Sequence, residues 1–285
     1  MGWSQRGSDV PVPSGARIRV RVSGTGPPVL LLHGWPQTSA AWHRVEPALA
    51  GAHTVVAADL PGYGESLLPP DAGVAASGKR AMARDLTEAM AALGHDRFAV
   101  VGHDRGARCG FRLALDHPDR VVALAALDVL PTADVLARAD ARFARGAWHW
   151  FLLAQPADLP ERLIAADPEA VLGRGLTDVC DPAALAAYRA AWARPEVVRG
   201  MCQDYRAGFD VDLADDEADR RRRGIRCPVL VLWGDRGPLG AVPDVLDVWR
   251  GWAPVVDGGP LPTGHHIAEE RPDLVAESLL RFLRA

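Results

Sequence analysis

A short apolar run, residues 98–101, leads into the stretch GHDRG at 102–106, and a helical pattern follows. This is the frame of a nucleophile elbow, G-x-S-x-G, with aspartate in place of serine. The two glycines permit the sharp turn that lifts the central side chain above the edge of a sheet. We therefore predict that Asp104 is a nucleophile. A simple helix cap would account for the aspartate alone but not for both glycines.

Two arginines, Arg105 and Arg108, follow Asp104 within one helical turn. Their charges and the free N–H groups of a helix N-terminus should keep the Asp104 carboxylate ionised. A guanidinium also pairs with a carboxylate through two parallel hydrogen bonds. Because an anionic nucleophile repels an anionic substrate, nearby cations are needed to offset the charge. We expect both arginines to bind the carboxylate of a small anionic substrate; the alternative is a pair of solvated helix arginines.

The remaining members of a hydrolytic triad have candidates further along the chain. Two histidines, His265 and His266, precede the last helical pattern, and we favour His265 because it directly follows the glycine of the turn. Asp128 and Asp235 each end an apolar run, and by this pattern either carboxylate could accept the histidine N–H. The aspartate that does not pair with the histidine would be a turn or capping residue.

A second glycine turn follows the apolar run 29–32, in the sequence LLLHGWP. Such a loop can supply a backbone N–H to an oxyanion hole. We expect the two donors to be the N–H groups of Trp35 and Arg105, the latter directly after the nucleophile.

Short apolar runs that alternate with amphipathic helices must position these residues. Runs that are apolar on both faces indicate a mostly parallel sheet covered by helices on both sides, an α/β fold. The expected strands are 17–22, 29–32, 54–58, 98–101, 121–127 and 229–233, with a weaker one at 253–256, and the expected helices are 38–50, 79–93, 105–116, 242–252 and 272–283.

One long segment, residues 130–223, has helical patterns and no strand candidate. We interpret it as a helical cap inserted into the sheet domain. The predicted organisation is therefore a first core part at 1–129, the cap at 130–223 and a second core part at 224–285.

Composition and charge argue against several classes of binding partner. The 285 residues carry a formal net charge of −4, which argues against a nucleic-acid binder. Four scattered cysteines without C-x-x-C spacing give no reason to expect a zinc cluster, and we expect neither a metal nor a cofactor. No apolar run reaches membrane-spanning length and no secretory signal is visible, so we expect a cytoplasmic protein without membrane contact.

Several motifs of the sequence match those of a known family. From about residue 29 onward the chain resembles the haloacetate dehalogenases of the α/β-hydrolase superfamily, which include the fluoroacetate dehalogenases. The motifs that carry this resemblance are LLHGWPQT, ADLPGYGES, KRAMARDL, GHDRGAR, WHW and DYRAG.

The resemblance assigns a role to each matching position. It implies Asp104 as nucleophile, His265 as base and Asp128, rather than Asp235, as its acid. It also implies a homodimer. One departure is that LTDVCDP (176–182) has no tryptophan where family members place one in the cap, which bears on substrate size. Arg105 and Arg108 would hold the substrate carboxylate, and His149, Trp150 and Tyr205 would face the departing halide.

Chemistry explains why a dehalogenase needs aspartate at the elbow. Displacement of halide by serine would leave an ether, whereas displacement by Asp104 leaves an ester that water activated by His265 can hydrolyse. We therefore predict conversion of fluoroacetate or chloroacetate to glycolate and halide. The alternatives are an epoxide hydrolase with the same nucleophile and a non-catalytic protein of the same fold; an esterase is less favoured because no serine occupies the elbow.

Overall fold

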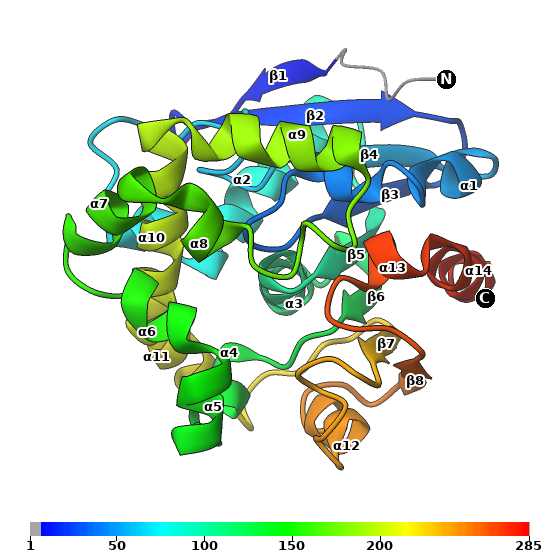
Figure 1. Ribbon diagram of the computed structural model, residues 1–285. Helices are drawn as coiled ribbons and strands as arrows, with labels where there is room; N and C mark the ends of the chain where they lie inside the picture. Colours follow the sequence, from blue (N-terminus) through cyan, green and yellow to red (C-terminus); the bar gives the residue numbers. More distant parts are fainter. Residues whose placement is uncertain (1–6, 285) are drawn as a thin grey trace.

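The computed structural model describes residues 7–284, and this part of the chain contains one eight-stranded sheet (Figure 1). The strand order is β1-β2-β4-β3-β5-β6-β7-β8; β1 and β2 are antiparallel to their neighbours and every other pair is parallel. The strands are β1 (Ser8–Pro11), β2 (Arg17–Ser23), β3 (Pro28–Leu32), β4 (Thr54–Ala58), β5 (Phe98–His103), β6 (Val121–Leu127), β7 (Val229–Gly234) and β8 (Val256–Leu261).

Burial follows the position of each strand in the sheet. All six residues of β5, in the middle, are buried, as expected for a strand covered on both faces. In β2, near the edge, Ile18 and Val20 are buried while the intervening arginines are more exposed. The apolar runs of the sequence therefore predicted the central parallel strands, because only those strands are apolar on both sides.

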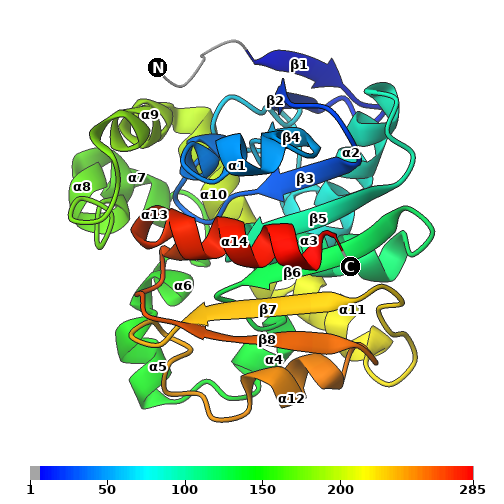
Figure 2. The same cartoon turned by 90° about the vertical axis from the view of Figure 1, so that its right-hand side faces the viewer.

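Helices cover both faces of the sheet and form two separate apolar clusters. Helices α1 (Glu46–Ala50) and α14 (Pro272–Phe282) lie on one face, in front of the sheet in Figure 2. The other face is covered by α2 (Lys79–Ala92), α3 (Arg105–Asp116) and α12 (Val245–Arg250). Three short elements complete this layer structure: η1 (Ser39–Trp42), η2 (Val74–Ser77) and α13 (Ile267–Glu270).

The chain between β6 and β7 forms only helices, which we call the cap helices. Most of them gather at the side of the molecule toward which β7 points, whereas the last one, Val211–Asp219, lies behind the sheet (Figure 2). Their apolar residues join the core on the α2 and α3 face, so that the cap helices pack onto the sheet layer. They are α4 (Thr132–Leu136), α5 (Ala141–Gly146), α6 (Trp148–Leu153), α7 (Leu159–Ala166), α8 (Pro168–Leu172), α9 (Pro182–Trp192), α10 (Pro195–Phe209) and α11 (Val211–Asp219).

The predicted α/β fold is confirmed, with two differences at the sheet edges. Strand β1 was not expected from the sequence, and it is a short edge strand with a single buried side chain, Val10. The strand expected at 253–256 instead runs from Val256 to Leu261. Its sequence VDGGPL has a low β-propensity, but an edge position tolerates glycine and proline. A side chain at Gly258 would meet the Val231 carbonyl oxygen at 1.8 Å, so the pairing with β7 requires glycine there.

The helix expected at 38–50 is divided into η1 and α1, because Pro47 fits only the first turn of a new helix. Among the described residues, none of the helices combines the length and apolar character needed to cross a bilayer.

Candidate active site

The turn between β5 and α3 has the geometry of an elbow. Asp104 has a φ of 46° and a ψ of −116°, a conformation that non-glycine residues seldom adopt. Its neighbours must be small, because a Cβ on Gly106 would lie 2.4 Å from the carbonyl oxygens of Leu32 and His33. The Asp104 side chain makes no capping bond to α3, which rules out the simple helix-cap interpretation. A strained backbone therefore holds this carboxylate in the position expected of a nucleophile.

One of the two expected oxyanion donors already contacts the carboxylate. The Trp35 N–H donates to Asp104 Oδ2 over 3.0 Å, from the loop that follows β3. The Asp104 Oδ1 atom is left with the Arg108 Nη1 atom at 3.6 Å. The two oxygens are thus inequivalent, with Oδ2 held by a backbone donor and Oδ1 without a close one. The Arg105 N–H as a second donor stays a prediction.

His265 is paired with Asp128. The His265 Nδ1 atom lies 2.5 Å from Asp128 Oδ2, and Asp128 Oδ1 accepts the Gly234 N–H at 2.9 Å. Asp128 stands directly after β6 with a φ of 49° and has no exposed side-chain surface. By contrast, Asp235 is 49% exposed at the end of β7 and lies near Arg236. The geometry therefore favours Asp128 over Asp235 as the acid.

The charges around these groups reinforce one another. Burial raises the pKa of Asp104, but the positive charges of His265, Arg108 and other neighbours outweigh burial and hold that pKa well below its ordinary value. Burial lowers the pKa of His265, yet its hydrogen bond to Asp128 and the two carboxylate charges give a net rise. Asp104 is thus a carboxylate at neutral pH, and His265 is more basic than a free imidazole.

Arg105 is held by a carboxylate that the sequence analysis did not identify. Its Nε and Nη2 atoms donate to the two carboxylate oxygens of Asp204 at 2.9 and 2.5 Å. Asp204 is fully buried in α10 and also accepts from the Tyr63 hydroxyl at 2.6 Å and from Lys79 Nζ. Arg105 is therefore only partly available to a substrate carboxylate: among the described residues, only its buried Nη1 atom has no hydrogen-bond partner.

Arg108 is less constrained than Arg105. Its Nε atom donates to the Leu130 carbonyl at 3.2 Å, and its guanidinium lies 4.4 Å from the Trp150 ring. Its Nη1 atom is buried without a hydrogen-bond partner in the described part of the chain, although Asp104 Oδ1 is 3.6 Å away. Two buried guanidinium nitrogens, one of them near Asp104, thus have unused donors, which is an arrangement suited to a carboxylate ligand.

The three residues expected to face a halide lie together. The His149 ring stacks on Trp35 at 4.7 Å with an interplanar angle of 1°, and the Tyr205 ring is 5.9 Å from both His149 and Trp150. Helices α6 and α10 supply these rings, and the Trp35 backbone bonds to Asp104. Trp35 therefore connects the aromatic cluster to Asp104.

Two members of the cluster have altered pKa values. Burial, and then the charge of Asp104, raises the pKa of Tyr205 well above its ordinary value. Burial lowers the pKa of His149 to about 4. At neutral pH, Tyr205 is therefore a protonated phenol and His149 a neutral imidazole, so each retains a hydrogen to donate.

The residues predicted from the sequence lie together in the fold. The carboxylates that hold two of them in place, Asp204 and Glu270, were not predicted. Asp204 directly precedes the predicted Tyr205, but its buried partners Lys79, Tyr63 and Arg105 are far away in the sequence. Glu270 was missed for the same reason. It accepts the N–H groups of Gly264 and His266 and so fixes the loop that carries His265.

Comparison with known proteins defines the class. Residues 27–272 match the model of the alpha/beta hydrolase fold family, and the chain belongs to that family. It is a hydrolase of the α/β fold.

Two curated relatives differ in their reactions. The chain is 43% identical to a fluoroacetate dehalogenase from a Burkholderia species, over 93% of this chain and 90% of that protein. It is 33% identical to a soluble epoxide hydrolase from a Corynebacterium strain, over 94% of each chain.

Among solved structures, a Pseudomonas aeruginosa protein provisionally described as an epoxide hydrolase is similar over almost its whole length. It is 50% identical to this chain, with a TM-score of 0.93, covering 98% of this chain and 95% of that one. Likeness in fold and sequence thus extends to both reaction types, and the side chains of the site must distinguish them.

The pairing of His265 leads to a direct prediction. Asp128→Asn should lower kcat by on the order of 10²- to 10⁴-fold, because an amide cannot hold the imidazole tautomer or stabilise its cation. The exposed Asp235→Asn should stay within about twofold of the wild type. Steady-state kinetics on both variants would check this, and a larger loss in the Asp235 variant would contradict the pairing.

Proposed function

We propose that the protein hydrolyses haloacetates to glycolate and halide. The observation that carries this proposal is the Arg108 Nη1 atom, which is buried, has no hydrogen-bond partner among the described residues and lies 3.6 Å from the ionised Asp104 carboxylate. The Nη1 atom of Arg105 is a second buried nitrogen without such a partner. A substrate that carries its own carboxylate would satisfy both donors, whereas an uncharged substrate would leave them unpaired at an energetic cost. The likeness to a fluoroacetate dehalogenase supports the same substrate class.

The first step is an in-line displacement. With Asp104 Oδ2 held by the Trp35 N–H, Oδ1 is the oxygen free to attack the carbon that bears the halogen. A carbon–oxygen bond forms as the carbon–halogen bond breaks, and the halide leaves with the bonding electron pair. The product is an ester whose carbonyl oxygen is Oδ2, already next to its oxyanion donor.

The second step is hydrolysis of this ester. The His265 Nε2 atom takes a proton from water, while Asp128 on Nδ1 fixes the tautomer and stabilises the imidazolium. The resulting hydroxide attacks the ester carbonyl. Collapse of the tetrahedral intermediate breaks the ester C–O bond, and the His265 imidazolium returns its proton to the departing glycolate oxygen. The carboxylic acid left on Asp104 loses its proton to solvent. The Asp104 carboxylate is regenerated.

Halide departure needs donors that strengthen as the negative charge develops. The phenol of Tyr205 and the imidazole of His149 both keep a proton at neutral pH, and the Trp150 indole supplies a third N–H. Fluoride is the poorest leaving group among the halides and the strongest hydrogen-bond acceptor. The three donors therefore suit defluorination especially.

The epoxide hydrolase alternative is less well supported by the side chains. Opening an epoxide requires an acid for the developing alkoxide, and cap tyrosines usually provide it. Tyr188 is committed elsewhere, because its hydroxyl donates to Glu269 Oε1 at 2.5 Å. Tyr205 alone would remain for this role, and the two free guanidinium nitrogens would have no function in it.

The role of Arg108 can be tested through substrate charge. Arg108→Leu should raise KM for chloroacetate roughly 10- to 100-fold, as expected for the loss of hydrogen bonds between charged groups, and should affect uncharged chloroacetamide much less. Comparing halide release from both substrates cancels any effect of the variant on Asp104 itself. The exposed Arg120→Leu is the control. Equal losses on both substrates would show that Arg108 does not bind a carboxylate.

The halide donors can be tested with a series of leaving groups. Tyr205→Phe should slow fluoroacetate turnover by about tenfold or more and bromoacetate turnover by about twofold or less, because bromide needs little help to leave. Tyr188→Phe removes a buried cap hydroxyl of the same kind and should not discriminate between halides. If Tyr205→Phe lowered both rates equally, the hydroxyl would not act on the halide.

A further inference from the structure

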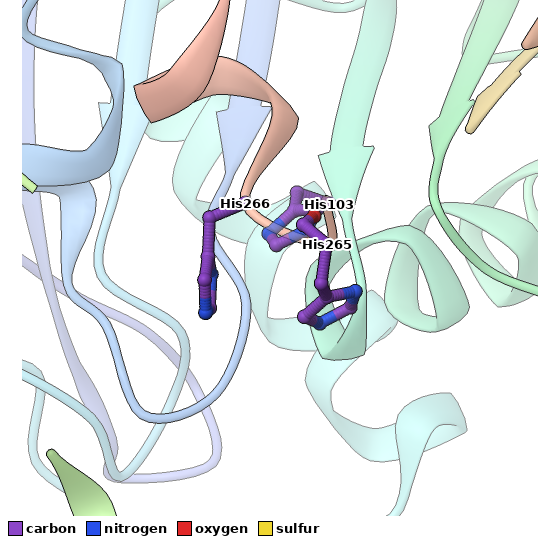
Figure 3. Close-up of side chains that lie close together, drawn as sticks. All are labelled: His103, His265 and His266. Carbon is purple, nitrogen blue, oxygen red and sulfur yellow. The ribbon is translucent and has the colours of Figure 1, made fainter. Parts of the chain in front are cut away.

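Three imidazoles meet beside the nucleophile (Figure 3). His103 is the last residue of β5, and His265 and His266 lie on the loop between β8 and α13. One ring nitrogen from each residue lies within 4.8 Å of the others. The sequence did not predict this group, because His103 is more than 160 positions from the other two and only the fold brings them together.

The three rings have different partners. His103 is buried, and its Nε2 atom lies 2.9 Å from the His265 carbonyl oxygen. The His265 ring uses Nδ1 for Asp128, which leaves Nε2 as its remaining nitrogen. His266 has a buried Nδ1 atom with no hydrogen-bond partner among the described residues. The proposed reaction uses only His265, so His103 and His266 have no assigned role in it.

We infer that His103, His265 and His266 form a binding site for Zn²⁺ that inhibits the enzyme. Imidazole is a preferred ligand of zinc, and three of them satisfy most of a tetrahedral site. The Asp128 carboxylate on His265 Nδ1 is the second-sphere partner that zinc-bound histidines commonly have, and it makes the free nitrogen more basic. The orphaned Nδ1 of His266 would gain a partner, which removes the cost of leaving it buried and unpaired.

The site requires a small contraction. Tetrahedral Zn–N bonds of about 2.0–2.1 Å place ligand nitrogens about 3.3 Å apart, closer than the present upper limit of 4.8 Å. Because Glu270 holds the backbone of the loop that carries His265 and His266, this contraction must come from rotation of the side chains. The Asp104 carboxylate also borders the cluster: a Cβ on Gly34 would lie 2.8 Å from His103 Nδ1 and 3.2 Å from Asp104 Oδ2.

Zinc at this position would inhibit because it occupies the nitrogen that must take a proton from water. Inhibition should be reversed by a chelator and should not occur with Mg²⁺, which prefers oxygen ligands. The inference uses His265 as the base of the proposed reaction, but zinc binding itself needs no substrate. The zinc site and the proposed haloacetate hydrolysis can therefore be disproved independently of each other.

The test measures binding and activity on the same variants. Zinc affinity is determined by competition with a chromophoric chelator, using the whole metal-free protein. We expect micromolar binding of one Zn²⁺ by the wild type and at least tenfold weaker binding by His266→Phe. His266→Gln is a second variant in case the phenylalanine disturbs folding. His95→Phe, at the opposite end of β5, is the matched control and should bind like the wild type.

Activity provides the second measurement. Without metal, His266→Phe should turn over chloroacetate within about threefold of the wild type, and the zinc concentration for half-inhibition should rise at least tenfold. Failure of the wild type to bind Zn²⁺, or equal binding by the wild type and both His266 variants, would overturn the site. Zinc binding that depends on His266 in a protein inactive on haloacetates would uphold the site and contradict the proposed function.

Discussion

A buried negative charge on Asp104 is the constraint around which the site is arranged. The proposed reaction requires an ionised carboxylate, although burial opposes ionisation. The cations that offset it come from the helix it begins and from the loop of His265. One of these cations, Arg105, is itself buried and requires a counter-charge, and Asp204 provides it together with Lys79 and Tyr63. An interior with alternating charges thus connects the elbow to cap helix α10.

The topology of the sheet brings these charged residues together. Parallel strands end at one edge of the sheet, so Asp104 after β5, Asp128 after β6 and the β8 loop converge there. The cap helices then bring Tyr205 and Trp150 over the guanidinium groups at 4.4 Å each. Packed in this way, the arginines are shielded from solvent, and each keeps one buried nitrogen without a hydrogen-bond partner among the described residues. An anionic ligand would complete the charge balance.

Much of this could be predicted from the sequence, because local patterns determine it. The elbow glycines, the apolar central strands and the histidine turn are each recognisable within a dozen residues. They predicted the fold class and the candidate residues Asp104 and His265. Position at a strand end left Asp128 and Asp235 open, because both end strands; the family resemblance implied Asp128, and the pairing with His265 in three dimensions favours the same residue. Asp204, Glu270 and the cluster around His103 were missed because each depends on contacts between distant segments. Strand β8 was misplaced because an edge position imposes little on its sequence.

We propose that Asp104 forms a covalent ester with the substrate. Water activated by His265 then hydrolyses this ester. Intact-protein mass spectrometry of His265→Asn after exposure to chloroacetate tests this most directly. The account predicts release of about one halide per protein molecule and a stable added mass corresponding to a carboxymethyl group, located on Asp104 by peptide mapping. The double variant with Asp104→Asn should show neither. Normal turnover by His265→Asn, or a trapped adduct in His266→Asn instead, would contradict the account.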